Sequence, residues 1–298
     1  MPEQSRLING LIFRLVRKHI AGPTYSSALK IVRALDQEGM GTTITFLNEN
    51  VKDQAKAKYN TNTYIHAMKQ ASRLGLHSSI SVRPSQIGFT INNGWFEKNL
   101  SELASAAKDY DITVWLESEE GITPKEVLEA CASQPCESQI GLEIPMQLNE
   151  KDMQFVLGRC SKLKLITSGY KSERKPHVRH HDEKVDKVHA YCRDIAIMAK
   201  RCSKIYIHDS DEKVLAKVAS ESKQYRKSIV FELPLGYSKR WKTKLAAMKL
   251  NLNAYVPYGK DWASYALYRL TDGHIREIAA SVLKYKNERQ SDGEENGQ

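Results

Sequence analysis

Several polar and ionisable side chains stand at the ends of short apolar runs, where they could form a site for a charged ligand. The four that we single out are Arg83, Glu117, His208 and Tyr255. A guanidinium, a carboxylate, an imidazole and a phenol suit a small zwitterionic ligand or a cofactor that carries phosphates. The alternative, that these side chains only cap strand ends and pair with one another, stays open at this point.

Eight apolar runs rich in β-branched residues alternate with helical patterns, and they must position these side chains. The runs are residues 42–47, 78–82, 113–116, 139–144, 163–166, 204–207, 228–233 and 254–256. This alternation predicts parallel strands joined by crossover helices, and eight such strands close a barrel. We therefore predict an α/β fold, a (βα)8 TIM-like barrel, in which the loops after the strands meet at one mouth.

The remaining segments predict helices and two flanking regions. Helices are expected over 51–73, 96–108, 124–132, 150–160, 183–201, 212–220, 239–249, 262–269 and 275–285. Asn48 or Asn50 is available as the N-cap of the first of these. We divide the chain into an N-terminal helical segment 1–38, a barrel 39–285, and a polar tail 286–298 that we expect to be disordered.

Composition bears on the compartment and the partners. No apolar run approaches the ~18–20 residues that span a bilayer, and the first residues lack the cleavage site of a signal peptide. The five cysteines are odd in number and form no C-x-x-C pair, which argues against a disulfide framework or structural zinc. We expect a cytoplasmic protein, and the net charge of +10 leaves open a peripheral contact with the inner face of a membrane.

Several binding motifs are absent from the sequence. There is no G-x-G-x-x-G or P-loop pattern, so a Rossmann site or a P-loop is not expected. Basic residues are mostly dispersed and no aromatic-interleaved basic motif occurs, so we predict no nucleic-acid partner. The histidine-rich run 177–182 lacks a second ligand group at a fixed offset and is interpreted as a solvated loop, so no metal site is assigned.

Read in order, the strand ends resemble the proline dehydrogenase family over about residues 25–285. The segment 255–270, which begins Tyr-Val-Pro-Tyr-Gly and continues Tyr-Ala-Leu-Tyr-Arg-Leu, is similar to the final strand and helix of that family. Segments 45–51 and 81–88, and the Ile-His-Asp run at 207–209, are also similar. The resemblance implies an enzyme that oxidises L-proline to 1-pyrroline-5-carboxylate by hydride transfer to FAD and passes electrons to quinone or another acceptor.

The resemblance also implies roles for individual residues. Arg83, Glu117 and Tyr255 would be catalytic, and Tyr268 and Arg269 would bind the substrate. The residues that would contact the flavin cofactor are Lys164, Ile166, Ser168, His208 and Asp272. A guanidinium is the group that clamps a substrate carboxylate, and Arg269 stands at a clamp position.

The chain departs from the family pattern at several of these positions. Tyr268 replaces the first of two clamp arginines, and Pro145 replaces a glutamine that hydrogen-bonds the flavin. Thr167 stands at a lysine, while Arg83 and Glu117 replace a lysine and an aspartate. Two alternatives therefore stay open beside proline oxidation: a flavoenzyme for another cyclic imino or amino acid, and a barrel without flavin that binds a ligand.

Overall fold

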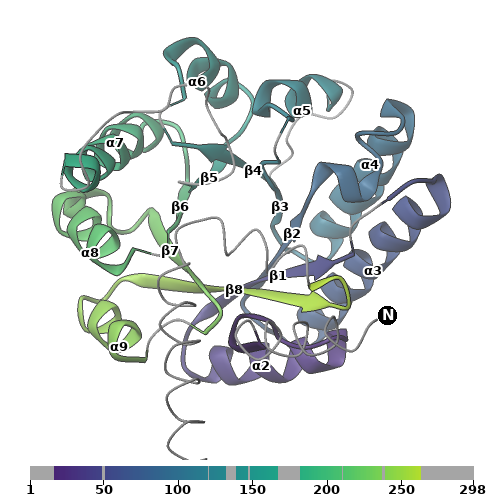
Figure 1. Ribbon diagram of the computed structural model, residues 1–298, viewed down its shortest axis with the longest axis horizontal. Coiled ribbons are helices and arrows are strands. Elements are labelled where there is room, and N and C mark those ends of the chain that lie inside the picture. The colour runs from purple at the N-terminus through teal and green to yellow at the C-terminus, as the bar shows by residue number, and fades with distance from the viewer. Residues whose placement is uncertain are drawn as a thin grey trace, which may run out of the picture.

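Eight parallel strands close into a barrel with helices around it, as the sequence predicts (Figure 1). The computed structural model describes residues 17–48, 51–119, 121–131, 139–146, 148–166, 182–209, 211–236 and 239–262. The strands follow one another around the barrel in chain order, and the last strand, β8, pairs with the first, β1. The prediction of a (βα)8 barrel is confirmed.

All eight predicted strands are present. They are β1 (Gly41–Leu47), β2 (Ser78–Val82), β3 (Val114–Leu116), β4 (Ile140–Pro145), β5 (Lys162–Ile166), β6 (Lys204–His208), β7 (Ile229–Pro234) and β8 (Asn251–Gly259). Most bounds differ from the prediction by one residue, but β8 is much longer than the expected 254–256. The polar N-terminal end of β8 hid part of its length, because Asn251 and Asn253 face β7 and the barrel interior rather than an apolar layer.

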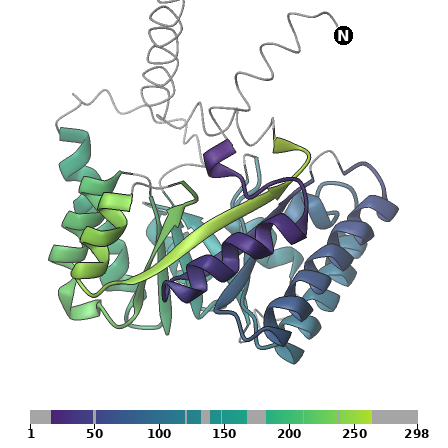
Figure 2. The same cartoon turned by 90° about the horizontal axis from the view of Figure 1, so that it is seen from below.

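The helices form the outer layer of the barrel (Figures 1 and 2). They are α2 (Tyr25–Gln37), α3 (Gln54–Arg73), α4 (Asn93–Asp109), α5 (Pro124–Ala130), α6 (Glu150–Leu157), α7 (Asp182–Met198), α8 (Glu212–Glu221) and α9 (Lys239–Ala247). Short 3₁₀ turns lie at Arg17–His19, Pro84–Ile87 and Lys223–Tyr225. The helices expected over 262–269 and 275–285 lie almost wholly outside the described residues, as does the tail.

The predicted cap of the long helix after β1 is wrong. Helix α3 begins at Gln54, and the side chain of Asp53 accepts a hydrogen bond from the backbone N–H of Lys56. Asn48 instead donates from Nδ2 to Asn60 Oδ1 at 2.6 Å, which ties the end of β1 to the helix. A carboxylate close to the helix start also interacts favourably with the helix dipole, so Asp53 is the better cap.

The described part of the N-terminal segment packs against the last strand. Figure 2 shows α2 running along β8, and the Tyr25 ring meets the Tyr258 ring edge-on at 5.8 Å. Ahead of the helix, the backbone N–H of Ala21 donates to Pro257 O at 2.7 Å. Gly259, at the end of β8, has φ +143, and any Cβ there would collide with the carbonyl oxygen of Leu47. The Tyr-Val-Pro-Tyr-Gly run therefore needs its glycine to pair with β1.

Strand side chains alternate between two environments. One set faces the helices and is almost entirely aliphatic, as with Ile44, Ile80 and Leu142, each at most 1% exposed. The alternating set faces the interior and contains Thr43, Glu143 and Glu232, which belong to β1, β4 and β7. The helices are thus held by apolar burial, whereas the interior is polar and depends on paired hydrogen bonds.

No helix among the described residues combines the length and the apolar character that a membrane crossing requires.

Candidate active site

The barrel interior brings together five of the residues predicted to be functional. Arg83 follows β2, Glu117 follows β3, Lys164 lies on β5, His208 ends β6 and Tyr255 lies on β8. Parallel strands all deliver their carboxyl ends to the same mouth, which explains why residues so distant in sequence meet. They form two connected groups, one around Glu117 and one around Glu232.

The first group crosses the barrel from β8 to β3. The hydroxyl of Tyr255 donates to Glu117 Oε1 at 2.6 Å, and Arg83 Nε donates to Glu117 Oε2 at 3.2 Å. Burial alone would raise the pKa of Glu117, but the Arg83 guanidinium and the Tyr255 hydroxyl hold it below its ordinary value. Glu117 is therefore an ionised carboxylate that fixes the orientation of both partners.

The second group is built on Lys164, whose side chain is fully buried. Its Nζ lies 2.8 Å from Glu232 Oε2, and the same oxygen lies 2.9 Å from His208 Nδ1. Burial would raise the pKa of Glu232, but Lys164 and His208 lower it to about 2. One carboxylate on β7 therefore holds both a lysine of β5 and a histidine of β6.

Glu232 is anchored from a third side by neutral hydrogen-bond donors. Thr43 Oγ1 donates to Glu232 Oε1 at 2.5 Å, and Asn253 Nδ2 donates to the same oxygen at 2.9 Å. Asn253 also donates to Thr43 at 2.7 Å, so the three side chains fix one another. A buried carboxylate with this number of donors is well satisfied, and its position is tightly defined.

A third carboxyl group, Glu143 on β4, completes the charge balance. Its Oε2 lies 3.9 Å from Lys164 Nζ, and its Oε1 accepts from the backbone N–H of Ser118 at 3.2 Å. Burial raises the pKa of Glu143 to about 8. The nearby carboxylates of Glu117 and Glu232 also raise this pKa, whereas Lys164 lowers it. The described interior thus holds the basic side chains of Arg83 and Lys164, two carboxylates and one carboxyl that keeps its proton at neutral pH.

Aromatic rings join the two groups. The His208 and Tyr255 rings meet edge-on, with centroids 5.4 Å apart and planes at 77°. Lys164 Nζ lies 5.8 Å from the centre of the Tyr255 ring and 5.2 Å from that of Trp115. Trp115 also packs on Tyr206 at 4.6 Å. A cation enclosed by ring faces and carboxylates is electrostatically stabilised although it is removed from water.

Two members of this cluster were not assigned a role from the sequence. Glu143 and Glu232 lie within the runs predicted to form strands, but the sequence analysis did not single out either of them as functional. The available signal was a glutamate inside an otherwise apolar strand, with the helix-facing neighbours Leu142 and Leu233 beside it. A charged residue that alternates with buried aliphatic ones must point into the barrel, and there it needs a partner.

The other predicted site residues have different outcomes. Ile166 is buried, at 4% exposure, at the end of β5. Ser168, Tyr268, Arg269 and Asp272 lie outside the described residues, as does Thr167. Pro145, which replaces a glutamine of the family pattern, ends β4 and pairs with Ile166 in the ladder.

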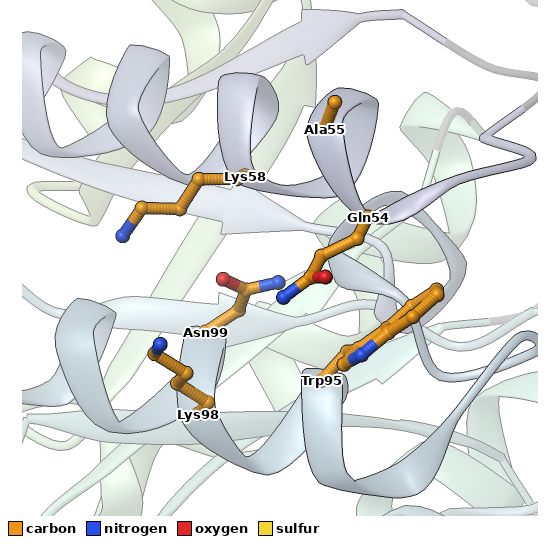
Figure 3. A pocket seen from close by; sticks show the side chains of 6 residues that line it. All are labelled: Gln54, Ala55, Lys58, Trp95, Lys98 and Asn99. Atoms are coloured by element: carbon orange, nitrogen blue, oxygen red, sulfur yellow. The ribbon is translucent and has the colours of Figure 1, made fainter.

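A separate pocket of about 310 Å³ lies in the helical layer between α3 and α4 (Figure 3). Its lining residues are Gln54, Ala55, Lys58, Trp95, Lys98 and Asn99. Lys58 forms an ion pair with Glu102, and Asn99 donates to the backbone of Ile87. None of the residues predicted to be functional lines this pocket, so we assign the chemistry to the strand ends.

Known proteins with similar sequences are proline dehydrogenases. Proline dehydrogenase 1 of Bacillus subtilis is 24% identical over 273 residues, which cover 90% of this chain and 89% of the relative. Proline dehydrogenase 2 of the same organism is 23% identical over 86% of this chain, and the Deinococcus radiodurans proline dehydrogenase is 20% identical over 91%. No family model matches the chain.

Along most of its length the chain is thus similar in sequence to bacterial proline dehydrogenases.

Solved structures agree on the fold. Proline utilization A of Bdellovibrio bacteriovorus superposes with a TM-score of 0.75 at 13% identity and covers 90% of this chain. The protein of the same name from Corynebacterium freiburgense gives a TM-score of 0.69 at 14% identity. This chain spans 33% of the length of each of those two proteins, so it corresponds to one part of them. The barrel fold is thus shared with these proteins although the sequences differ at most positions.

Proposed function

We propose that this chain is an FAD-dependent proline dehydrogenase that oxidises L-proline to 1-pyrroline-5-carboxylate. The observation that carries the proposal is the contact network at the strand ends. Arg83, Glu117 and Tyr255 form one half, while Lys164 and His208 form the other. Similarity to bacterial proline dehydrogenases along nine-tenths of the chain supports the same reaction class.

The donors present in the interior fit a flavin ring. Its carbonyl oxygens and ring nitrogens accept hydrogen bonds, and Lys164 on β5 carries N–H groups beside the His208 ring on the adjacent strand β6. Trp115 Nε1 is a buried donor without an acceptor among the described residues. A buried ammonium also suits a ring that gains negative charge on reduction. We propose that Lys164, Ile166 and His208 hold the ring, with Ser168 and Asp272 as further contacts.

The substrate would lie between this ring and the Glu117 group. When bound, the flavin supplies the hydride acceptor that the reaction requires. Arg269 would clamp the proline carboxylate, and Tyr255 would pack beside the pyrrolidine ring with its hydroxyl fixed by Glu117. Arg83, held by the same carboxylate, adds positive charge to the mouth and would partly replace the arginine that Tyr268 displaces.

Electrons would then pass from the flavin to quinone or another acceptor, and we propose this acceptor step separately from the oxidation of proline. A membrane quinone would require the barrel to approach a bilayer surface, which a net charge of +10 favours at anionic lipids.

Steady-state turnover with a dye acceptor tests the proposal. The purified chain, supplied with FAD, should reduce the dye when L-proline is added, and D-proline serves as the stereochemical control. Turnover only with a different cyclic imino acid would favour the alternative substrate that the Tyr268 position suggests. A chain that stays colourless with added FAD would contradict both enzymatic readings.

The carboxylate clamp can be tested separately. Arg269→Ala should raise the KM for proline strongly, because the bound carboxylate loses its partner. Arg226→Ala is the matched control, since Arg226 is exposed and donates to the backbone of Lys249 at the opposite end of the strands. Unchanged proline kinetics in Arg269→Ala would remove the clamp assignment.

A further inference from the structure

We propose that His208 is the general base that accepts the proton of the substrate amine, with Glu232 as the residue that positions it. This inference rests on the proposed function, because it assigns a proton that proline oxidation must release. It goes beyond the cofactor contact expected for His208. The geometry around both ring nitrogens carries it.

The Glu232 contact fixes which imidazole nitrogen carries hydrogen. His208 Nδ1 lies 2.9 Å from Glu232 Oε2, and this oxygen also receives Lys164 Nζ at 2.8 Å. The pKa of Glu232 is lowered to about 2, so the group is a carboxylate and can only accept hydrogen bonds. Nδ1 must therefore be the donor, and the neutral ring carries its lone pair on Nε2.

The lone pair is placed where a substrate could reach it. The His208 side chain is 21% exposed, in contrast to the fully buried Lys164 and Glu232. Tyr191 and Asp209 lie behind the strand, where the Tyr191 hydroxyl donates to the His208 carbonyl and to the Asp209 carboxylate. Within the described residues, no hydrogen-bond partner occupies Nε2.

The charged groups around His208 suit a base that becomes a cation. Glu232 on β7 lies against Nδ1, and Lys164 on β5 neutralises one unit of that carboxylate charge. The Tyr255 ring on β8 faces the imidazole edge-on, and Lys187 pairs with Asp209 behind the strand. Glu143 on β4 lies 3.9 Å from Lys164 and is the third carboxyl group near this lysine. The nearby carboxylate and the ring face are groups that interact favourably with an imidazolium formed by proton transfer.

The step balances in protons and electrons. One ammonium N–H bond of the substrate breaks, its electron pair stays on nitrogen, and a new N–H bond forms at His208 Nε2. That pair becomes the second bond of C=N when the adjacent C–H bond gives hydride to the flavin oxidant. The imidazolium proton then leaves through the partly exposed face of the ring.

Rapid-mixing kinetics test the role through its pH dependence. His208→Gln keeps a side-chain amide for Glu232 but has no base, so proline-dependent flavin reduction at neutral pH should slow by ~10²–10⁴-fold. The deficit should shrink as pH rises, because solution then supplies the deprotonated amine. His189→Gln, at an exposed histidine of α7, is the matched control and should keep the wild-type profile. A deficit of constant size at all pH values would overturn the proposal.

Two further measurements separate a base from a structural residue. Added imidazole should restore part of the rate in His208→Ala, and failure to do so in a folded variant would count against a base. Nitrogen NMR of His208 in the unaltered chain should show hydrogen on Nδ1 only, and hydrogen on Nε2 would overturn the assignment. The NMR measurement needs no turnover, so it tests the position of the hydrogen even if the chain does not oxidise proline. In that case the proposed function fails, and with it the assignment of the accepted proton to proline.

Discussion

The two faces of the same eight strands differ in chemistry, and the difference separates stability from function. Leu142 and Glu143 are adjacent on β4, yet Leu142 packs beneath the helices and Glu143 lies beside Lys164 in the interior. Burial of the helix-facing side chains supplies most of the stabilising free energy, since apolar area removed from water is favourable. The interior instead buries charges, which is costly unless every one is paired. A barrel that keeps such an interior does so for its chemistry.

The largest effect is expected where one partner of the interior is removed. Lys164→Met leaves the Glu232 carboxylate buried without its lysine, which should lower the free energy of unfolding by ~3–5 kcal/mol. The double variant Lys164→Met/Glu232→Gln removes both charges and should recover much of this loss. Urea unfolding of both variants measures it, and a single variant as stable as the wild-type chain would break the contrast between the two faces.

Truncation of a helix-facing side chain should lower stability while it leaves the reaction rate nearly unchanged. Leu142→Ala removes a side chain that is 1% exposed, so the free energy of unfolding should fall by ~2–5 kcal/mol. The rate of proline oxidation per folded, flavin-loaded molecule should stay close to the wild-type value. Unfolding curves and rapid-mixing kinetics on the same preparations give both quantities. A large rate loss would mean that the two faces are not separable.

Adding a methyl group to the packed interior should lower the free energy of unfolding by less than either of these changes. A Cβ at Gly141 would lie 2.5 Å from two ring atoms of Trp115, whose indole is already packed on Tyr206. Gly141→Ala should therefore destabilise the chain by ~1–3 kcal/mol. Gly158→Ala is the control, because the nearest atom to its Cβ would be the Gln154 carbonyl oxygen at 3.4 Å. Equal stabilities of the two variants would show that the Trp115 ring adjusts freely.

The smallest effect, counted per pH unit, concerns the proton on Glu143. The folded chain holds it to about pH 8, above the ordinary pKa of 4.5, so burial of the neutral acid favours folding most at low pH. The free energy of unfolding should fall as pH rises between these values, by at most ~1.4 kcal/mol per pH unit. Glu143→Gln mimics the neutral acid and should flatten this decline. A slope identical to that of the wild-type chain would show that Glu143 is ionised throughout.

The sequence predicted the fold well because its signals are local. β-Branched runs, turn residues and helix patterns located all eight strands, although the polar N-terminal end of β8 concealed part of its length. It predicted the site less completely. Arg83, Glu117, Lys164, His208 and Tyr255 were assigned through a family resemblance, and all five meet in the structure.

What the sequence could not provide was the pairing inside the barrel. Glu232 contacts residues of β1, β5, β6 and β8, and no spacing in the sequence encodes contacts that only closure creates. The predicted N-cap of α3 was wrong for a related reason. Several polar residues follow β1, and the choice among them depends on where the chain turns into the helix, which the structure places at Asp53.

The central claim is that the charged interior performs proline oxidation, and anaerobic bleaching of the bound flavin tests it most directly. The FAD-loaded chain is mixed with L-proline in the absence of oxygen, and the yellow absorbance is followed with time. The account predicts complete loss of that absorbance with L-proline and little change with D-proline. Persistent yellow absorbance at saturating L-proline, with FAD firmly bound, would contradict it.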